Sequence, residues 1–414
     1  MRILRWQPRK LLKFTCGFVT LCVMLLVIYT LNKVWEENRC SVEESNTLLD
    51  DVCQRYRVHS VDGNLCKDLC ETRAIRYVKC TNYRRGKKVF IMECNGRCQA
   101  GETVKVVMKT KHRTKEEYDH LVLPLNDDGS LTKDGLEMAK IMMINKAYGD
   151  MHFTVSSSQN IFSELWSMDY DQYVKTATYK NADHVALLSI WSLLQQDEYL
   201  FMKVYQNLPY VPLLYGTCGE FYFMEYAPPG DILSPGFFTK SPWSQRADAA
   251  LKLIDVAQSL DTDFYQPVHF CDIKVDNFGL GSDLRVKVLD SDSLFFDEKM
   301  SMNLKGPCTK HDDCDFFDCR GWCKINNKTC DGRRTNNNLQ NICEDIFIDR
   351  PPNFFQGLLH DAPPTIAGEL ATVLQNCAYP NKNMAEVVRT PTSRETMERL
   401  YQLLQTKTDS WKFS

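Results

Sequence analysis

The sequence lacks the short motifs that mark several common enzyme classes. It contains neither H-E-x-x-H, the zinc-binding motif of metalloproteases, nor G-x-S-x-G, which carries the nucleophile of α/β-hydrolases, and its eight histidines are scattered. No repeated or low-complexity segment is present, which excludes solenoid architectures. The formal net charge of -3 lacks the basic excess of a general nucleic-acid binder, so we expect no nucleic-acid partner. We interpret the local basic runs at 84–88 and 109–115 as solvated surface.

Charge is also absent from one stretch near the N-terminus. Phe14–Leu31 has about 18 residues without a charged side chain, enough to cross a bilayer as a helix. Residues 1–13 before it carry basic but no acidic residues, which predicts a cytosolic tail and places the remainder in the lumen. A cleaved signal peptide is the alternative, but the stretch is long and no small-x-small cleavage site follows. We therefore predict a signal-anchor at 14–31 and a single-pass type II membrane protein.

Cysteine, in contrast, is abundant. Two of the 18 cysteines lie in the apolar stretch, and most of the other 16 form an early and a late cluster in the remainder. This large, even number is typical of disulfides in an oxidising compartment. The close pairs have C-x-x-x-C spacing rather than the C-x-x-C of zinc knuckles, so we favour disulfides over zinc, with the pairing left open. The sequon at Asn327 lies in the late cluster and predicts glycosylation if it is exposed.

Periodicity predicts an α+β fold for the rest of the chain. Alternation and valine content indicate strands at 102–110 and 285–290, and an apolar run at 220–230 ends in Pro-Pro-Gly. Apolar residues at helical spacing predict helices at 135–147, 182–204, 245–260, 365–377 and 393–405. Residues 40–98 show little periodicity. The order of these elements is the order found in protein kinases.

Two acidic residues 18 positions apart, Asp272 and Asp290, indicate the chemistry. A kinase needs a carboxylate that takes a hydroxyl proton, a lysine near the moving phosphate and oxygen ligands for the metal. Asp272 and Lys274 fit the first two roles as catalytic residues. Asn277 and Asp290 fit the third, because their oxygens suit Mg²⁺ or Mn²⁺. We therefore predict ATP and Mg²⁺ (or Mn²⁺) as cofactors.

A second pair, further towards the N-terminus, fits the binding of ATP phosphates. Lys109 ends the strand Val-Val-Met-Lys, as the phosphate-pairing lysine does in V-A-I-K. Glu198 lies at about the distance expected for the helix glutamate that pairs with this lysine. Lys175 is an alternative for the lysine, because it lies closer to Glu198 in the sequence.

Other parts of the kinase pattern are missing. No G-x-G-x-x-G precedes Lys109, Phe270-Cys271 precede Asp272 where His-Arg is usual, and Ser291-Asp292 follow Asp290 where Phe-Gly is usual. No A-P-E follows; the late cysteine cluster takes its place. These absences favour an alternative, a catalytically inactive pseudokinase that acts as a luminal binding scaffold.

Several segments resemble the divergent protein kinase domain 1 family. They include GKKV, VVMK, SLLQQDEY, LCKDLCE, CTKHDDCDFFDC and NNNLQNIC. The resemblance implies a single-pass type II protein of the endoplasmic reticulum membrane with a cysteine-rich, kinase-like luminal domain, and it places the lysine role on Lys109. Some members carry a calcium loop before the Glu198 helix. The matching stretch 179–184 lacks those ligands, so no calcium regulation is expected here.

Together these observations predict a two-lobed, protein-kinase-like α+β fold with cysteine-rich insertions, preceded by one transmembrane helix. The expected divisions are a luminal cysteine-rich segment at 32–98, a kinase-like N-lobe with an insertion at 99–226, and a C-lobe at 227–414 with a cysteine-rich insertion at 308–343. The expected activity is transfer of the ATP γ-phosphate to a hydroxyl of a luminal protein or glycan. The pseudokinase scaffold stays open as the alternative.

Overall fold

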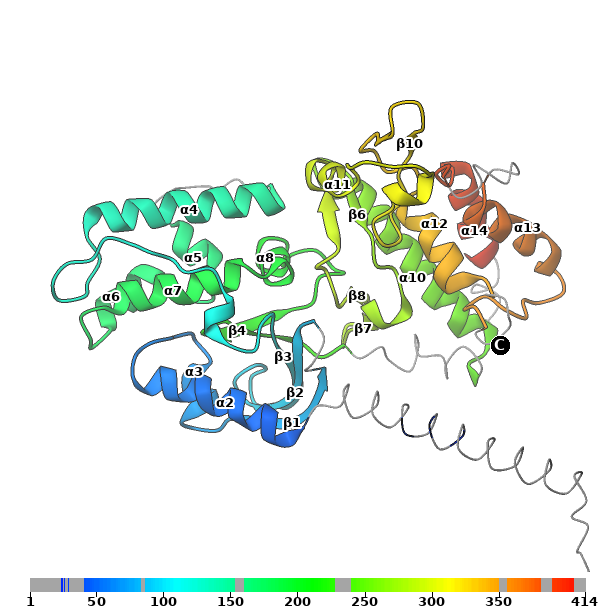
Figure 1. Ribbon diagram of the computed structural model, residues 1–414. Coiled ribbons are helices and arrows are strands. Elements are labelled where there is room, and N and C mark those ends of the chain that lie inside the picture. Colours follow the sequence, from blue (N-terminus) through cyan, green and yellow to red (C-terminus); the bar gives the residue numbers. More distant parts are fainter. Residues whose placement is uncertain are drawn as a thin grey trace, which may run out of the picture.

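The structure is a computed structural model that describes residues 24, 26, 29, 41–82, 86–152, 160–227, 240–349, 356–380 and 389–405. A strand-rich N-terminal part and a mainly helical C-terminal part lie side by side (Figure 1), so the predicted α+β class is confirmed. The predicted signal-anchor at 14–31 falls almost wholly outside the described residues. Among the helices of these ranges, none combines the length and apolarity that a membrane crossing requires.

A five-stranded antiparallel sheet organises the N-terminal part. Its strand order is β1-β2-β3-β5-β4, and the pairing of β2 with β3 is continuous from Lys88–Thr110 to Asn95–Thr103. The predicted boundary between residues 98 and 99 therefore runs through the sheet, because β1 and β2 lie before it and β3 after it. The strands are β1 (Ile75–Asn82), β2 (Lys88–Asn95), β3 (Thr103–Thr110), β4 (Leu214–Cys218) and β5 (Phe221–Glu225).

The two faces of this sheet have different neighbours. On one face Phe90, Met108 and Phe223 pack against helix α2 (Val42–Arg57) and the segment around α3 (Cys66–Cys70) in one apolar cluster. Because strand side chains alternate, Val107 and Lys109 lie on the opposite face. That face lines the cleft described below. The sheet therefore has one face for stability and one available to a ligand.

A helical insertion separates β3 from β4. It contains η1 (Lys115–Glu117), α4 (Lys133–Met151), α5 (Ile161–Leu165), α6 (Tyr170–Thr176), α7 (Ala182–Leu194) and α8 (Asp197–Val204). The predicted helix at 182–204 is thus two helices. The break comes at Gln195 and Gln196, whose side-chain amides donate to the carbonyls of Asp119 (3.1 Å) and Glu220 (2.7 Å). These long-range bonds fix the start of α8, the helix that carries Glu198.

The C-terminal part packs short strands against long helices. Strand β6 pairs with β9, and β7 forms a hairpin with β8; both strand pairs lie beside α10 in Figure 1. Helix α10 contributes Ala250, Leu253 and Ile254 to the large core shared with α12, α13 and α14. The elements are α10 (Trp243–Thr262), β6 (Val268–Phe270), η2 (Val275–Asn277), β7 (Phe278–Leu280), β8 (Val286–Val288), β9 (Leu294–Phe296), α11 (Asp297–Asn303), η3 (His311–Cys314), β10 (Cys323–Lys324), β11 (Thr329–Cys330), α12 (Asn338–Ile342), η4 (Cys343–Phe347), α13 (Ala367–Ala378) and α14 (Arg394–Gln405).

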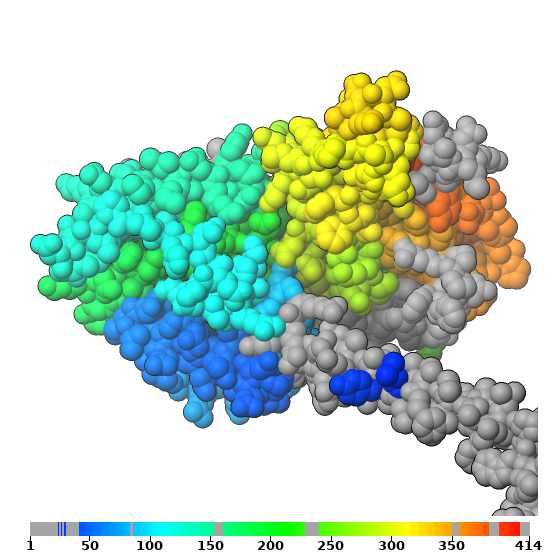
Figure 2. Space-filling view, in the orientation of Figure 1, coloured from blue at the N-terminus to red at the C-terminus, as the bar shows by residue number. Residues whose placement is uncertain are grey.

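Disulfides are present within the N-terminal part and within the C-terminal part, as the cysteine content predicts. Of the three C-x-x-x-C pairs only Cys94–Cys98 bonds within itself. The cysteines of the others pair with distant partners, which spacing alone does not reveal. Further bonds within the described parts of the chain include Cys53–Cys70, Cys66–Cys218, Cys271–Cys319, Cys308–Cys323, Cys314–Cys330 and Cys343–Cys377. The segment around β10 and β11 projects from the surface (Figure 2, yellow), with Asn327 exposed in its turn.

Candidate active site in the cleft beside the sheet

A cleft of about 690 Å³ lies between the sheet and the β7–β8 hairpin. This volume is within the usual range for small-molecule sites. Its apolar lining comes from Val89, Ile91, Val107, Met224 and Leu289, and its polar lining includes Lys109, Asn277 and Asp290. An apolar slot with charged groups at one end suits a molecule that has both a flat ring and phosphates.

Lys109 and Glu198 form a buried ion pair at this cleft. The ammonium Nζ of Lys109 lies 2.7 Å from Oε1 of Glu198, and the two side chains are 9% and 1% exposed. The same Nζ donates to the carbonyl of Leu289, also at 2.7 Å. The pair therefore ties β3 to α8 and to the residue before Asp290. Lys175, the alternative partner from the sequence, lies exposed on α6.

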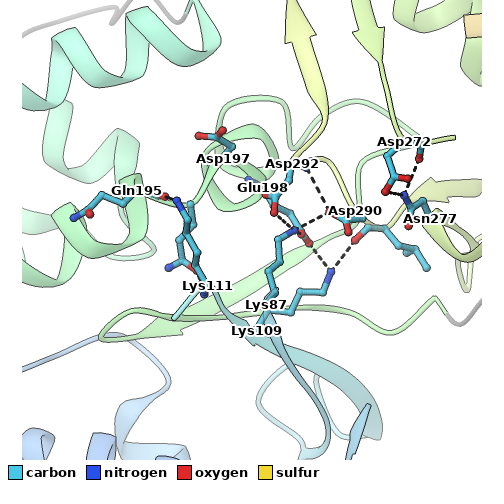
Figure 3. A network of polar contacts seen from close by, with 12 residues as sticks. Lys87, Lys109, Lys111, Gln195, Asp197, Glu198, Asp272, Asn277, Asp290 and Asp292 are labelled. Atoms are coloured by element: carbon cyan, nitrogen blue, oxygen red, sulfur yellow. Dashed lines mark hydrogen bonds and ion pairs between the residues drawn. The ribbon is translucent and has the colours of Figure 1, made fainter. Parts of the chain in front are cut away.

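Asp272, Lys274 and Asn277 gather in the loop after β6. Oδ2 of Asp272 accepts from Nζ of Lys274 at 2.7 Å and from Nδ2 of Asn277 at 2.8 Å. Nδ2 of Asn277 also donates to the backbone carbonyl of Asp272. The Asn277 amide group is thereby oriented with its nitrogen on Asp272, which leaves its oxygen as the acceptor that a metal needs. Figure 3 shows Asp272 and Asn277 near Asp290.

The β7–β8 hairpin brings Asp290 next to this loop. The backbone N–H of Leu289 donates to the carbonyl of Asn277 at 2.8 Å, so the residues at the two ends of the hairpin are neighbours. Burial would raise the pKa of Asp290, but the positive charges of Lys87 and Lys109 outweigh it and lower that pKa to about 2. Asp290 is therefore an anion at neutral pH, as a metal ligand must be.

Lys87 is a site residue that the sequence interpretation missed. Its Nζ lies 2.9 Å from Oδ1 of Asp290 and 2.8 Å from Oδ2 of Asp292, and it also bonds Glu198 (Figure 3). Burial opposes its charge, but attraction to Glu198, Asp292 and Asp290 prevails and raises its pKa well above the ordinary value. The interpretation of 84–88 as solvated surface is wrong for Lys87 and for Lys88, which is also buried. A run of basic residues does not reveal which one of them meets carboxylates from distant segments.

The late cysteine segment supports the loop that carries Asp272. Cys271, which stands where a kinase has arginine, is bonded to Cys319. Next to this bond, Oδ2 of Asp318 accepts from the N–H of Ile273 at 2.5 Å, and the N–H of Asp318 donates to the carbonyl of Cys271 at 2.9 Å. These bonds hold the backbone on both sides of Asp272, so a covalent and hydrogen-bonded brace fixes the position of its carboxylate.

Two models of one protein family match this chain. One, described as the protein-kinase domain of FAM69, matches residues 190–380, and the other, described as the N-terminal cysteine-rich ER domain of FAM69, matches residues 7–150. The sheet spans both matched regions. Strands β1 to β3 lie in residues 7–150, and β4 and β5 lie in residues 190–380. Lys87 and Lys109 thus come from the region named cysteine-rich, and Glu198 and Asp290 from the region named kinase.

One curated relative is the divergent protein kinase domain 2A of Xenopus tropicalis. It is 30% identical over 201 residues, which is 45% of this chain and 45% of that protein. More than half of the relative thus lies outside the match. The predicted resemblance to divergent, cysteine-rich kinase-like proteins is confirmed by these matches.

Proposed function

The chain belongs to the FAM69 family of kinase-like proteins, and we propose that it transfers the γ-phosphate of ATP to a hydroxyl of a protein or glycan in the lumen of the endoplasmic reticulum. The observation that carries this proposal is the Lys109–Glu198 ion pair at a cleft that Asn277 and Asp290 also line. A kinase depends on this pair together with a metal-binding aspartate.

The residues fit the parts of phosphoryl transfer. The apolar lining from Val107, Met224 and Leu289 suits an adenine ring, and Lys109 at the polar end suits the phosphates. The acceptor oxygen forms a bond to the γ-phosphorus as the bond to the leaving ADP oxygen breaks. Asp272 takes the proton of the acceptor hydroxyl, and Lys274 offsets charge on the moving phosphoryl group.

The donor set also fits a divalent cation. Asn277 and Asp290 would hold Mg²⁺ or Mn²⁺, because both offer hard oxygen atoms and the Asp290 carboxylate is ionised. The bound metal would supply positive charge that neutralises the phosphates.

The setting we propose is a single-pass type II protein with its bulk in the lumen. The disulfides among the described residues support an oxidising compartment, and the family description names an ER domain. The apolar stretch at 14–31 with basic residues before it supports the anchor and its orientation.

Nucleotide-dependent thermal stabilisation of the full-length protein in detergent tests the proposal. We expect ATP with Mg²⁺ or Mn²⁺ to raise the melting temperature of the parent and of Lys175→Met, a control on exposed α6, but not of Asp290→Ala. Asp272→Ala should retain this stabilisation and lose turnover, measured as ADP formation with secretory-pathway extracts as acceptors. Equal stabilisation of the Asp290→Ala variant, or full turnover by Asp272→Ala, would reject the assignment.

A second candidate function is a pseudokinase that binds a luminal partner without phosphoryl transfer. The observation that favours it is the position of Lys87, whose ammonium already pairs with Asp290, the carboxylate that would meet the metal. A protein that shows no nucleotide-dependent stabilisation in the experiment above would support this scaffold function instead.

A further inference from the structure

Three carboxylates converge behind the nucleotide cleft. Glu198, Asp290 and Asp292 each offer an oxygen atom, and these atoms lie within 4.8 Å of one another. Glu198 is buried at the start of α8, whereas the other two come from the segment after β8. Carboxylates this close repel one another unless a cation lies between them. The chain itself supplies that cation, since Nζ of Lys87 is within ion-pair distance of all three.

The same oxygens suit a divalent metal ion. Mg²⁺ and Mn²⁺ prefer carboxylate oxygens, and a doubly charged ion gains more from three carboxylates than a single ammonium does. Glu198 and Asp292 are not part of the pair Asn277 and Asp290 considered above. The backbone N–H of Glu198 donates to Oδ1 of Asp292 at 3.3 Å, so α8 and the segment after Asp290 already hold each other in place.

Two buried hydroxyls at this cluster have no hydrogen-bond partner among the described residues. The phenol of Tyr222 is fully buried and lies opposite Lys109 in the β3–β5 pairing, so it shares the cleft face. Its cross-strand partner Lys109 bonds Glu198, so the ring lies beside the residue pair that holds this carboxylate. The hydroxyl of Ser291, between two of them in sequence, is also buried and unpaired. Buried hydroxyls normally have partners, and a hydrated metal would provide them.

The position of Lys87 in the chain allows its ammonium to move away from the three carboxylates. It precedes β2, which begins at Lys88, and follows Gly86 at φ +63°, a backbone conformation natural to glycine. A lysine head on a flexible four-carbon stem can move outward while the strand stays paired. Lys109, in contrast, lies within β3 and also bonds the carbonyl of Leu289.

We propose that Glu198, Asp290 and Asp292 form a divalent-cation site and that Lys87 occupies it as a built-in competitor, so that the metal and the Lys87 ammonium exclude each other. Metal entry would release Lys87 towards the cleft, where it can pair with phosphates in place of the missing glycine-rich loop. This inference deepens the proposed function. The competition would control nucleotide binding only if the protein binds ATP as proposed above.

Mn²⁺ binding without nucleotide tests the competition. Full-length protein in detergent is titrated, and free Mn²⁺ is followed by its electron paramagnetic resonance signal. We expect Lys87→Gln to lower the half-saturating Mn²⁺ concentration roughly tenfold or more, because a charge a few ångströms from the ion is removed. Lys175→Gln removes the same charge from an exposed position on α6 and should leave the value unchanged. Adding Asp292→Asn to Lys87→Gln should weaken binding again. A Lys87→Gln variant that binds no tighter than the parent overturns the proposal.

Lysine labelling of the unmutated chain provides a test that does not depend on folding of a variant. The rate of reductive methylation of Lys87, followed by mass spectrometry, should be several-fold higher with saturating Mn²⁺ than in metal-free buffer. Unchanged Lys87 labelling would overturn the proposal. ATP-dependent stabilisation is measured in the same samples. ATP binding without competition rejects the Lys87 inference alone, whereas competition without ATP binding rejects the proposed function alone.

Discussion

The Lys109–Glu198 pair makes a prediction about stability that is independent of any ligand. Both side chains are at least nine-tenths buried, and Lys109 has no other carboxylate among its described hydrogen-bond partners. Glu198→Gln therefore leaves a buried ammonium with neutral oxygen acceptors only, including the Leu289 carbonyl, and without its carboxylate partner. Breaking a buried ion pair from one side typically costs about 3–5 kcal/mol. We expect a loss of about 3 kcal/mol, at the low end, because the Leu289 carbonyl is retained.

A double-mutant cycle separates this pair from general damage to the cleft. Lys109→Met alone should also destabilise, because it leaves Glu198 with Lys87 as its only described cation. The double variant should be more stable than the sum of the single losses, with a coupling energy of about 2 kcal/mol. Guanidinium unfolding of the full-length protein with its disulfides intact, followed by tryptophan fluorescence, measures each corner.

Lys175 provides the matched control for the cycle. It is the lysine that sequence proximity also suggested as the partner of Glu198, and it lies exposed on α6. A cycle between Lys175→Met and Glu198→Gln should show coupling below about 0.5 kcal/mol. If the Lys109 cycle is equally additive, or if Glu198→Gln costs less than about 1 kcal/mol, the buried pair does not hold α8 against β3 and the site as described is refuted.

Two further predictions concern pH and glycosylation. Because the folded pKa of Asp290 is about 2, below its ordinary 3.8, its carboxylate contributes stability above about pH 4 that is lost as the pH falls towards 2. The difference in guanidinium midpoint between the parent and Asp290→Asn should therefore shrink between pH 5 and pH 2.5, and a constant difference would contradict the ion pairs of Asp290. Asn327 is exposed between β10 and β11, so a chain with a luminal C-terminal part should shift on gels after endoglycosidase treatment, unlike Asn327→Gln; an unshifted parent would contradict the proposed topology.

Local pattern predicted the elements that carry most of the site. Strand β3, which carries Lys109, and helix α10, which precedes the Asp272 loop, both lie within a few residues of their predicted bounds. They were predictable because alternation and helical spacing are properties of neighbouring residues. Local pattern failed for the helix at 182–204. Its interruption depends on bonds from Gln195 and Gln196 to distant backbone carbonyls, and periodicity contains no trace of those partners.

Long-range pairing accounts for the other failures. The hairpin β1–β2 was missed because residues 40–98 show little periodicity, and its strands gain their place from pairing with β3. The pairing of Cys271 with Cys319 was equally hidden, although the presence of disulfides was not. In both cases the composition indicates the kind of interaction, whereas the fold alone determines the partners.

The two departures from the kinase pattern that flank the cleft belong together. The sequence has the basic run 84–88 in place of a glycine-rich loop, and it has Asp292 two residues after Asp290 in place of glycine. In the structure one lysine of that run, Lys87, bonds Asp292 at 2.8 Å. One departure adds a positive charge and the other a negative charge, so the net charge around Lys109, Glu198 and Asp290 is unchanged. Independent decay of an unused site would give no reason for opposite charges to arise in contact from segments about 200 residues apart. The two missing motifs are therefore linked in the structure, because the side chains that stand in their places form one ion pair.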